Sequence, residues 1–172
     1  MKEIILKVDK NDNVVGEVPK DAAHDDKGIL HRAFLVIVFN KEGKILLAKR
    51  SKLKRLWPGF WDGSIASHQR NSETMAEAVK RRLKEELGIK KSEVKSLFKF
   101  CYQTSFGKVG SEKEICHVFE ARAKEKIKPN KREVVDLKWL NFKKLKEDIK
   151  NNPRKYTPWF LIVYKQFLND TI

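Results

Sequence analysis

The chain has 172 residues, and its 38 Lys and Arg outnumber its 23 Asp and Glu, which gives a formal net charge of +15. This length supports one domain, and a hydrophobic fraction of 41% is enough for a packed core, which excludes wholesale disorder. No run approaches the roughly 18 apolar residues of a membrane span, and the charged N-terminal sequence lacks the apolar stretch of a signal peptide. We therefore expect a cytoplasmic protein that makes no membrane contact.

The basic charge and the low number of cysteines limit the classes of function that the chain could have. The lysines are spread along the chain and form no stripe with base-reading groups, so specific nucleic-acid binding is not favoured. A positive field would still attract a small anionic substrate. Only two cysteines occur, Cys101 and Cys116, and without an export signal they are expected to be reduced thiols.

Strands and one long loop are predicted in the first 72 residues. Two short β-branched runs within residues 3–18 surround the turn-rich sequence DKNDN and predict a hairpin. A polar loop at residues 21–28 precedes an apolar run at residues 33–39, which predicts a buried strand that a turn connects to a second strand at residues 45–50. Residues 51–72 contain a proline, two glycines and many polar side chains, so we expect one long loop, which in a compact domain is usually functional.

The clearest helix is predicted for residues 73–87, with Ser72 as its N-cap and Gly88 as its C-terminal stop. Apolar side chains recur every four residues along this helix and predict one buried stripe: Met75, Val79, Leu83 and Leu87. On the polar side, two arginines precede two glutamates by four residues, a spacing that favours ion pairs between Arg81 and Glu85 and between Arg82 and Glu86.

The rest of the chain predicts three strands and two helices. The strands are expected at residues 96–106, 114–121 and 134–140, and a lysine-rich helix at residues 142–150. The last helix, residues 158–168, begins with Thr157 as N-cap and Pro158 as first residue. Its apolar side chains are expected to pack in the core rather than to cover a site or form a dimer face: Trp159, Phe160, Ile162, Val163 and Phe167. Strands on both sides of a central helix predict an α+β domain.

A few polar side chains suit metal binding. Three of the four histidines, His24, His31 and His68, lie in or beside polar segments. Glu112 and Glu114 are two residues apart at the start of a predicted strand, so their carboxylates face the same side. Imidazole and carboxylate together suit a divalent ion such as Zn²⁺, Mn²⁺ or Mg²⁺. Taken singly, each of these residues is more typical of a surface group, and spacing alone does not assemble them.

The segment from Glu73 to Ile89 resembles the Nudix box, whose pattern is Gly, five residues, Glu, seven residues, Arg-Glu, apolar, any, Glu-Glu, any, Gly, apolar. The matching residues are Glu73, Arg81, Glu85, Glu86, Gly88 and Ile89. In this family the segment holds divalent cations, and the substrate is usually a diphosphate joined to another group. Two positions depart from the pattern: Ser67 replaces the leading Gly, and Arg82 replaces a Glu that is a metal ligand in the family's hydrolases.

Across nearly its whole length the chain is similar to type 1 isopentenyl-diphosphate isomerases, which have the Nudix fold. The resemblance rests on short matches that include Ala23-His24, residues 30–34, Trp57-Pro58-Gly59, Ser67-His68 and Thr157-Pro158-Trp159. It implies one Nudix domain over residues 1–172, a mixed β-sheet sandwiched by helices, with an N-terminal hairpin and a C-terminal helix. It also implies a small diphosphate substrate and a monomer or homodimer.

The resemblance assigns roles to individual residues. The metal ligands would be His24, His31, His68, Glu112 and Glu114, with Glu86 helping to hold a second ion. The cofactors would then be Mg²⁺, held with the substrate diphosphate, and a second divalent ion, Mn²⁺ or Zn²⁺. The diphosphate would be bound by Lys20, Arg50, Lys54 and Arg82. Tyr102 and Trp159 would line the isoprenoid end, and the catalytic residues would be Glu114, Tyr102 and Glu86.

One departure leaves the reaction open. The isomerases of this family move a double bond with a Cys and a Glu on opposite faces of the substrate, and Ala66 stands at the position of that Cys. Ser67 is expected to point the other way, and Cys116 is expected to be a buried structural thiol. Three interpretations remain: a hydrolase of an isoprenoid or nucleotide-like diphosphate, which we favour from the sequence; an isomerase with a substitute acid or an engineered Ala66; and a non-catalytic prenyl-diphosphate binder.

Overall fold

The structure, a computed structural model, describes residues 3–124 and 126–168, with the backbone alone for Phe167 and Leu168. Nine strands form one mixed sheet: β1 Ile4–Val8, β2 Val14–Pro19, β3 His31–Phe39, β4 Ile45–Arg50, β5 Trp61–Asp62, β6 Ile65–His68, β7 Val94–Ser105, β8 Ser111–Arg122 and β9 Val134–Leu140. The α-helices are α1 Lys20–Ala23, α2 Met75–Leu87, α3 Phe142–Asn151 and α4 Pro158–Val163. A 3₁₀ turn, Pro153–Lys155, precedes α4, and a π-helical turn, Tyr164–Leu168, follows it.

Strand β3 lies at the centre of the fold, because four strands pair with it. It runs parallel to β8 and antiparallel to β6, and its two ends pair with β1 and β4. The apolar sequence of β3 is therefore buried on both faces, as the run at residues 33–39 predicts. The register sets His31 opposite Glu114 and Ala33 opposite His68.

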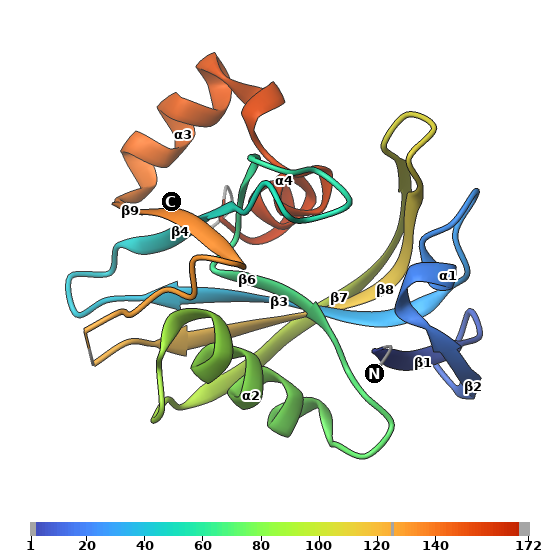
Figure 1. Cartoon of the computed structure of the whole chain (residues 1–172). Helices are drawn as coiled ribbons and strands as arrows, with labels where there is room; N and C mark the ends of the chain where they lie inside the picture. Colours follow the sequence, from blue (N-terminus) through green and yellow to red (C-terminus); the bar gives the residue numbers. More distant parts are fainter. Residues whose placement is uncertain (1–2, 125, 169–172) are drawn as a thin grey trace.

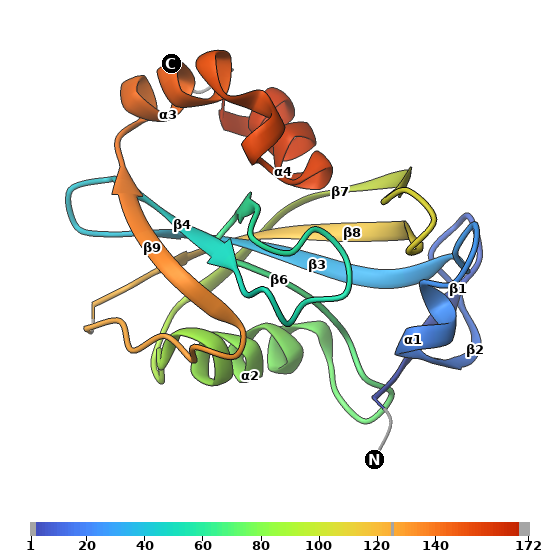
Figure 2. The same cartoon turned by 45° about the horizontal axis from the view of Figure 1, so that its top comes forward.

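Alternate residues of β3 face two separate cores, one on each side of the sheet. On one side Phe34, Val36 and Val38 pack against α2, whose Val79, Leu83 and Leu87 are buried as the four-residue spacing predicts. On the other side Leu35 and Ile37 pack against α4 through Trp159, Phe160 and Val163. Figures 1 and 2 show α2 on one face of the sheet and α3 and α4 on the other, which confirms the predicted mixed sheet between helices.

The apolar residues of α4 and of the turn that follows it confirm the predicted core packing in part. Trp159, Phe160 and Val163 are buried, and Ile162 is partly buried against the same core. The side chain of Phe167 lies outside the described residues. Among the helices that the structure describes, none combines the length and the apolar character needed to cross a membrane.

The start of α2 differs from the prediction. The helix begins at Met75, and its N-cap is Thr74, whose hydroxyl accepts a hydrogen bond from the Glu77 backbone N–H at 3.3 Å. The Glu77 carboxylate in turn accepts from the Thr74 backbone N–H at 2.7 Å, which completes a capping box. Ser72 therefore lies outside the helix, because the Thr74 box satisfies two free N–H groups. The predicted stop at Gly88 is confirmed by its left-handed φ of 72°.

The prediction of one long loop at residues 51–72 is wrong for the second half of that segment. Strands β5 and β6 lie within it, and β6 pairs with Ala33–Val36 of β3 through residues 65–68. No alternation of apolar and polar residues marks β6, so its structure depends on the open edge of β3 rather than on its own sequence. The polar segment at residues 21–28 also begins within a helical turn, α1, rather than as a loop throughout.

Candidate metal centre and substrate cavity

Five predicted metal ligands converge at one end of β3. His24 follows α1, His31 begins β3 and His68 ends β6, while Glu112 and Glu114 lie on the same face of β8. One potential ligand atom from each residue lies within 4.8 Å of all the others, and all five residues are buried. We call these five residues the His/Glu cluster. The register of β3 between β6 and β8 brings them together, which spacing along the sequence does not reveal.

Hydrogen bonds to backbone carbonyls orient two of the histidine rings. His24 Nδ1 lies 2.6 Å from the Lys20 carbonyl oxygen, and His31 Nδ1 lies 2.7 Å from that of Ile29. Because a carbonyl only accepts hydrogen bonds, each Nδ1 carries a proton, so that in the neutral ring the lone pair is on Nε2, which faces the His/Glu cluster. This arrangement is typical of histidines that bind metal ions.

The carboxylates complete a set of converging donor atoms. Glu114 Oε1 lies 3.3 Å from His31 Nε2 and 3.1 Å from His68 Nε2, while Glu114 Oε2 accepts a hydrogen bond from the Tyr102 hydroxyl at 2.6 Å. Glu112 Oε2 is buried without a hydrogen-bond partner, although His24 Nε2 lies only 2.8 Å away. Buried polar atoms left unpaired cost about 1–3 kcal/mol each. A divalent ion at the centre would satisfy these atoms, so the cluster fits a metal that accepts nitrogen and oxygen ligands.

Burial and close contacts shift the pKa values of the cluster. Burial lowers the pKa of His68 to about 3, so its imidazole is neutral and available as a ligand. Burial disfavours the ionised form of Glu114, but the close contacts of its carboxylate with His31 and His68 outweigh burial and hold the pKa of Glu114 well below its usual value. Burial and the neighbouring Glu114 carboxylate raise the pKa of Tyr102 well above its usual value. The pair therefore keeps its proton on the Tyr102 oxygen.

A cavity of about 570 Å³ adjoins the His/Glu cluster. Five residues that do not belong to the cluster but have predicted roles in binding or catalysis line this cavity: Lys20, Arg50, Lys54, Tyr102 and Trp159. Ala66 and Cys116 line it as well, and Cys116 is buried as predicted. Glu86 instead lines a smaller adjoining cavity, which shares Arg50, Lys54, Ala66 and Glu133 with the larger one.

The cations predicted to bind diphosphate are ion-paired within the chain. Lys20 Nζ lies 3.0 Å from Glu3, and Lys54 pairs with Glu133. These two partner carboxylates were not identified from the sequence, because Glu3 and Glu133 are remote from any motif. Arg132 also lines the cavity, and no sequence signal distinguished it from the other surface cations.

Arg82 binds the carboxylates of α2 and the loop before β9. Its guanidinium lies 2.6 Å from Glu86, 3.0 Å from Glu85 and 3.4 Å from Glu133. Arg81 likewise binds Glu73 at 2.7 Å and Glu85 at 3.2 Å. Both of the predicted four-residue ion pairs are thus confirmed. Arginines therefore bind all three acidic residues of the motif: Glu73, Glu85 and Glu86. In the described part of the chain, the group of potential metal ligands that no arginine binds is the His/Glu cluster.

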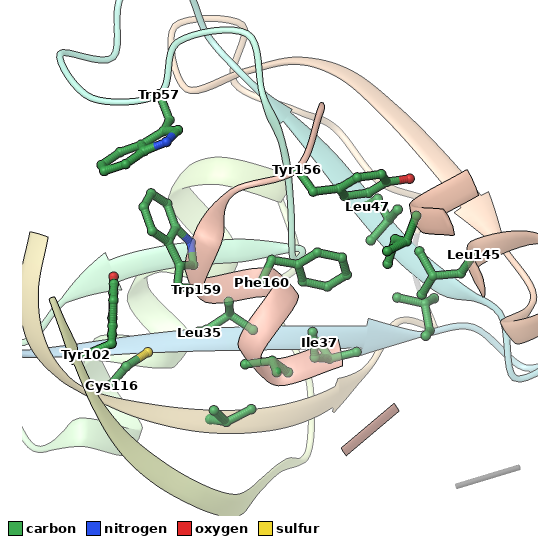
Figure 3. Packing of buried hydrophobic residues seen from close by; sticks show 14 of the residues in the cluster. Leu35, Ile37, Leu47, Trp57, Tyr102, Cys116, Leu145, Tyr156, Trp159 and Phe160 are labelled. Carbon is green, nitrogen blue, oxygen red and sulfur yellow. The ribbon is translucent and has the colours of Figure 1, made fainter. Parts of the chain in front are cut away.

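Aromatic side chains from three segments pack beside the cavity (Figure 3). The rings of Trp57 and Trp159 meet edge to face with centroids 5.1 Å apart, and the Tyr102 ring lies 6.2 Å from that of Trp159. Trp57 has a left-handed φ of 45°, which is unusual for a bulky residue and marks a tightly constrained loop. The cavity therefore combines a metal-binding set, cations and an aromatic wall.

Comparisons with known sequences agree with this site. The NUDIX domain model matches residues 29–160. Isopentenyl-diphosphate Delta-isomerase 1 of Photorhabdus laumondii is 41% identical over 161 residues, which cover 93% of this chain and 91% of the relative. Isopentenyl-diphosphate Delta-isomerase of Haloarcula marismortui is 36% identical over 174 residues, which cover 96% of this chain and 91% of the relative.

Solved structures share the fold. DR0079 from Deinococcus radiodurans aligns with a TM-score of 0.69 at 24% identity, covering 87% of this chain and 90% of that one. A MutT protein from Methanosarcina mazei aligns with a TM-score of 0.62 at 19% identity, covering 83% of this chain and 94% of that one. At these identities the likeness concerns the fold alone. The sequence matches show that the chain belongs to the Nudix family and is an enzyme of the Nudix hydrolase or isopentenyl-diphosphate isomerase type.

Proposed function

We propose that this chain binds a divalent metal ion in the His/Glu cluster and isomerises a short isoprenoid diphosphate by moving its double bond. The observation that carries the proposal is the position of Glu114, which belongs to the cluster and also accepts the Tyr102 hydroxyl at 2.6 Å beside the cavity. Double-bond migration requires a group that gives and takes a proton next to an apolar substrate. The names of the two relatives support the same substrate and reaction.

Each part of the cavity has a role in this proposal. Lys20 and Lys54 bind the diphosphate, and each exchanges its carboxylate partner for phosphate oxygens. The Glu114–Tyr102 pair gives one proton to a carbon of the double bond and takes one proton from another carbon of the substrate, so the pair ends with as many protons as it began with. The face of Trp159 stabilises positive charge that develops on the hydrocarbon. A divalent ion held by the cluster would supply positive charge that keeps Glu114 ionised and attracts the anionic substrate.

The arginine contacts of α2 favour isomerisation over hydrolysis. In Nudix hydrolases the carboxylates of this segment hold the metal ions, whereas here Arg82, which replaces one of those ligands, binds Glu85 and Glu86. An arginine in contact with a carboxylate lowers its affinity for a cation by direct competition. The His/Glu cluster is free of such arginines among the contacts of the described residues.

Hydrolysis of the diphosphate is the second candidate, and Ala66 is the observation that favours it. Ala66 lines the cavity with a methyl group, which cannot carry a proton. Hydrolysis needs a metal-activated water and no second proton carrier on the substrate's far side. The two candidates therefore differ in the product that they predict.

One incubation separates the two reactions. The protein is incubated with Mg²⁺ and either Mn²⁺ or Zn²⁺ and with isopentenyl diphosphate, and both dimethylallyl diphosphate and released phosphate are measured. Isomer without phosphate supports the proposal, whereas phosphate without isomer refutes it and supports hydrolysis. Binding without either product supports a non-catalytic binder.

Glu114→Gln tests the residue that carries the proposal. The variant is expected to lower isomer formation by at least about 10²-fold, which is typical for loss of a general acid or base. Glu120→Gln is the matched control, since Glu120 lies on the same strand but does not line the cavity. Equal activity of the two variants would contradict the role of Glu114.

A further inference from the structure

Asp62 is a buried carboxylate that contacts two residues of the cavity wall, Arg50 and Trp159, and neither the motif nor the metal centre accounts for it. It lies in β5 and is 3% exposed. Its Oδ1 accepts hydrogen bonds from the Gly63 backbone N–H at 2.8 Å, the Thr157 hydroxyl at 2.9 Å and the Trp159 indole N–H at 2.9 Å. Its Oδ2 accepts from Arg50 Nη1 at 3.3 Å and from the same indole at 3.0 Å. Because all of these neighbours are donors, both side-chain oxygens at this position have to act as acceptors.

Arg50 is held by more than this one contact. Its Nη2 donates to the Leu56 carbonyl at 2.8 Å, and its Nε donates to the Trp57 carbonyl at 3.1 Å. The guanidinium carbon lies 5.2 Å from the centre of the Trp159 ring, which is within the range of a cation–π contact. Among the contacts of the described residues, three of the five guanidinium N–H groups are therefore used, and two remain for a ligand. Both Arg50 and Trp159 line the cavity.

We propose that Asp62 is a positioning residue that fixes the Arg50 guanidinium for the substrate diphosphate. This inference rests on the function proposed above, because it requires that the cavity bind a diphosphate. Asp62 acts through Arg50 and does not itself touch the substrate. Without it, the Nη1 side of the guanidinium loses its anionic partner, and the side chain loses the contact that aligns it between the loop at Leu56 and the ring of Trp159. Diphosphate binding then has to align a cation that is held by fewer contacts.

The two oxygens of Asp62 allow its positioning role to be separated from its structural role. Oδ1 joins β5 to the start of α4 through Thr157, whereas Oδ2 holds Arg50. In Asp62→Asn the amide oxygen can keep the Oδ1 contacts, and the amide NH₂ then faces Arg50, donor against donor. Thr157→Val removes one Oδ1 contact and leaves the contact with Arg50. The two variants therefore weaken different sides of the same carboxylate.

The test measures the binding of inorganic diphosphate by calorimetry in the presence of Mg²⁺, together with thermal unfolding of each variant. Asp62→Asn is expected to weaken diphosphate binding by about tenfold, which corresponds to about 1.4 kcal/mol, because Arg50 loses its charge-assisted hydrogen bond. Thr157→Val is expected to lower thermal stability while leaving diphosphate affinity within about twofold of the wild-type value. If both variants lose stability and neither loses affinity, Asp62 is only structural and the inference is refuted.

A coupled variant tests whether the effect passes through Arg50. Arg50→Met alone is expected to weaken diphosphate binding, and adding Asp62→Asn to it is expected to cause no further loss. A further loss of tenfold in the double variant would show that Asp62 acts by another route and would overturn the inference. If the wild-type protein itself does not bind diphosphate, the proposed function fails, which is distinct from normal binding by Asp62→Asn.

Discussion

The ion pair between Arg82 and Glu86 supports a quantitative prediction about stability. Arg82 Nε and Nη2 donate to the same Glu86 oxygen at 3.0 and 2.6 Å, and the two side chains are only 9% and 5% exposed. Replacing Arg82 by Met removes the positive charge and leaves Glu86 buried without its partner. Breaking a buried pair on one side costs about 3–5 kcal/mol. For a chain of this size, 1 kcal/mol corresponds to about 2–4 °C in Tm, so we expect Tm to fall by at least about 6 °C.

Thermal unfolding followed by circular dichroism measures this effect. Arg122→Met is the matched control, because the Arg122 side chain is exposed at the end of β8, and its loss is expected to change stability by less than about 0.5 kcal/mol. A double variant, Arg82→Met with Glu86→Leu, is expected to regain part of the loss, since it also removes the unpaired charge. A fall in Tm of less than about 2 °C for Arg82→Met would refute the reasoning, because it would mean that Glu86 needs no cation.

Two further predictions concern the N-cap of α2 and the turn of the first hairpin. Thr74→Ala is expected to cost about 1 kcal/mol in unfolding experiments, whereas Ser72→Ala is expected to cost almost nothing; the reverse order would place the N-cap of α2 at Ser72. Asp12, in the turn of the first hairpin, binds Arg32, Lys99 and His117 at 2.7, 2.9 and 2.8 Å. Burial disfavours its ionised form, but these three partners outweigh it and lower the pKa of Asp12. Because the folded-state pKa is depressed, the stabilisation is present above the unfolded pKa of about 3.9 and is lost as pH falls through the folded pKa. Asp12→Asn should therefore lower stability by about 1 kcal/mol at neutral pH, and the difference from wild type should vanish in acid; a constant difference at every pH would contradict this.

The elements predicted best are those whose sequence has a strong local pattern. The apolar run of β3 and the four-residue stripe of α2 each specify burial without help from the rest of the chain. Strand β6 could not be predicted in the same way, because its pairing depends on an edge of β3 that is far away in the sequence. The N-cap was missed because two candidates, Ser72 and Thr74, lie close together, and only the position of Glu77 decides between them.

The site was predictable only as far as resemblance could take it. His24, His31 and His68 are scattered along the chain, and the pairing of β3 with β6 and β8 is what brings their rings together. No sequence pattern identifies the residues that hold the binding side chains in place. Asp62 lies between an aromatic residue and a glycine, without a spacing that points to Arg50 or Trp159.

The most direct test of the central claim is the metal content of the His/Glu cluster. The metal-free protein is titrated with Mn²⁺ or Zn²⁺ by calorimetry, and bound metal is then measured after gel filtration. We expect one tightly bound ion per chain in the wild-type protein and in Glu120→Gln. The variant that combines His68→Gln with Glu112→Gln is expected to lose this ion while keeping its fold by circular dichroism. Full metal content in that folded variant would contradict the assignment of the cluster as the metal centre.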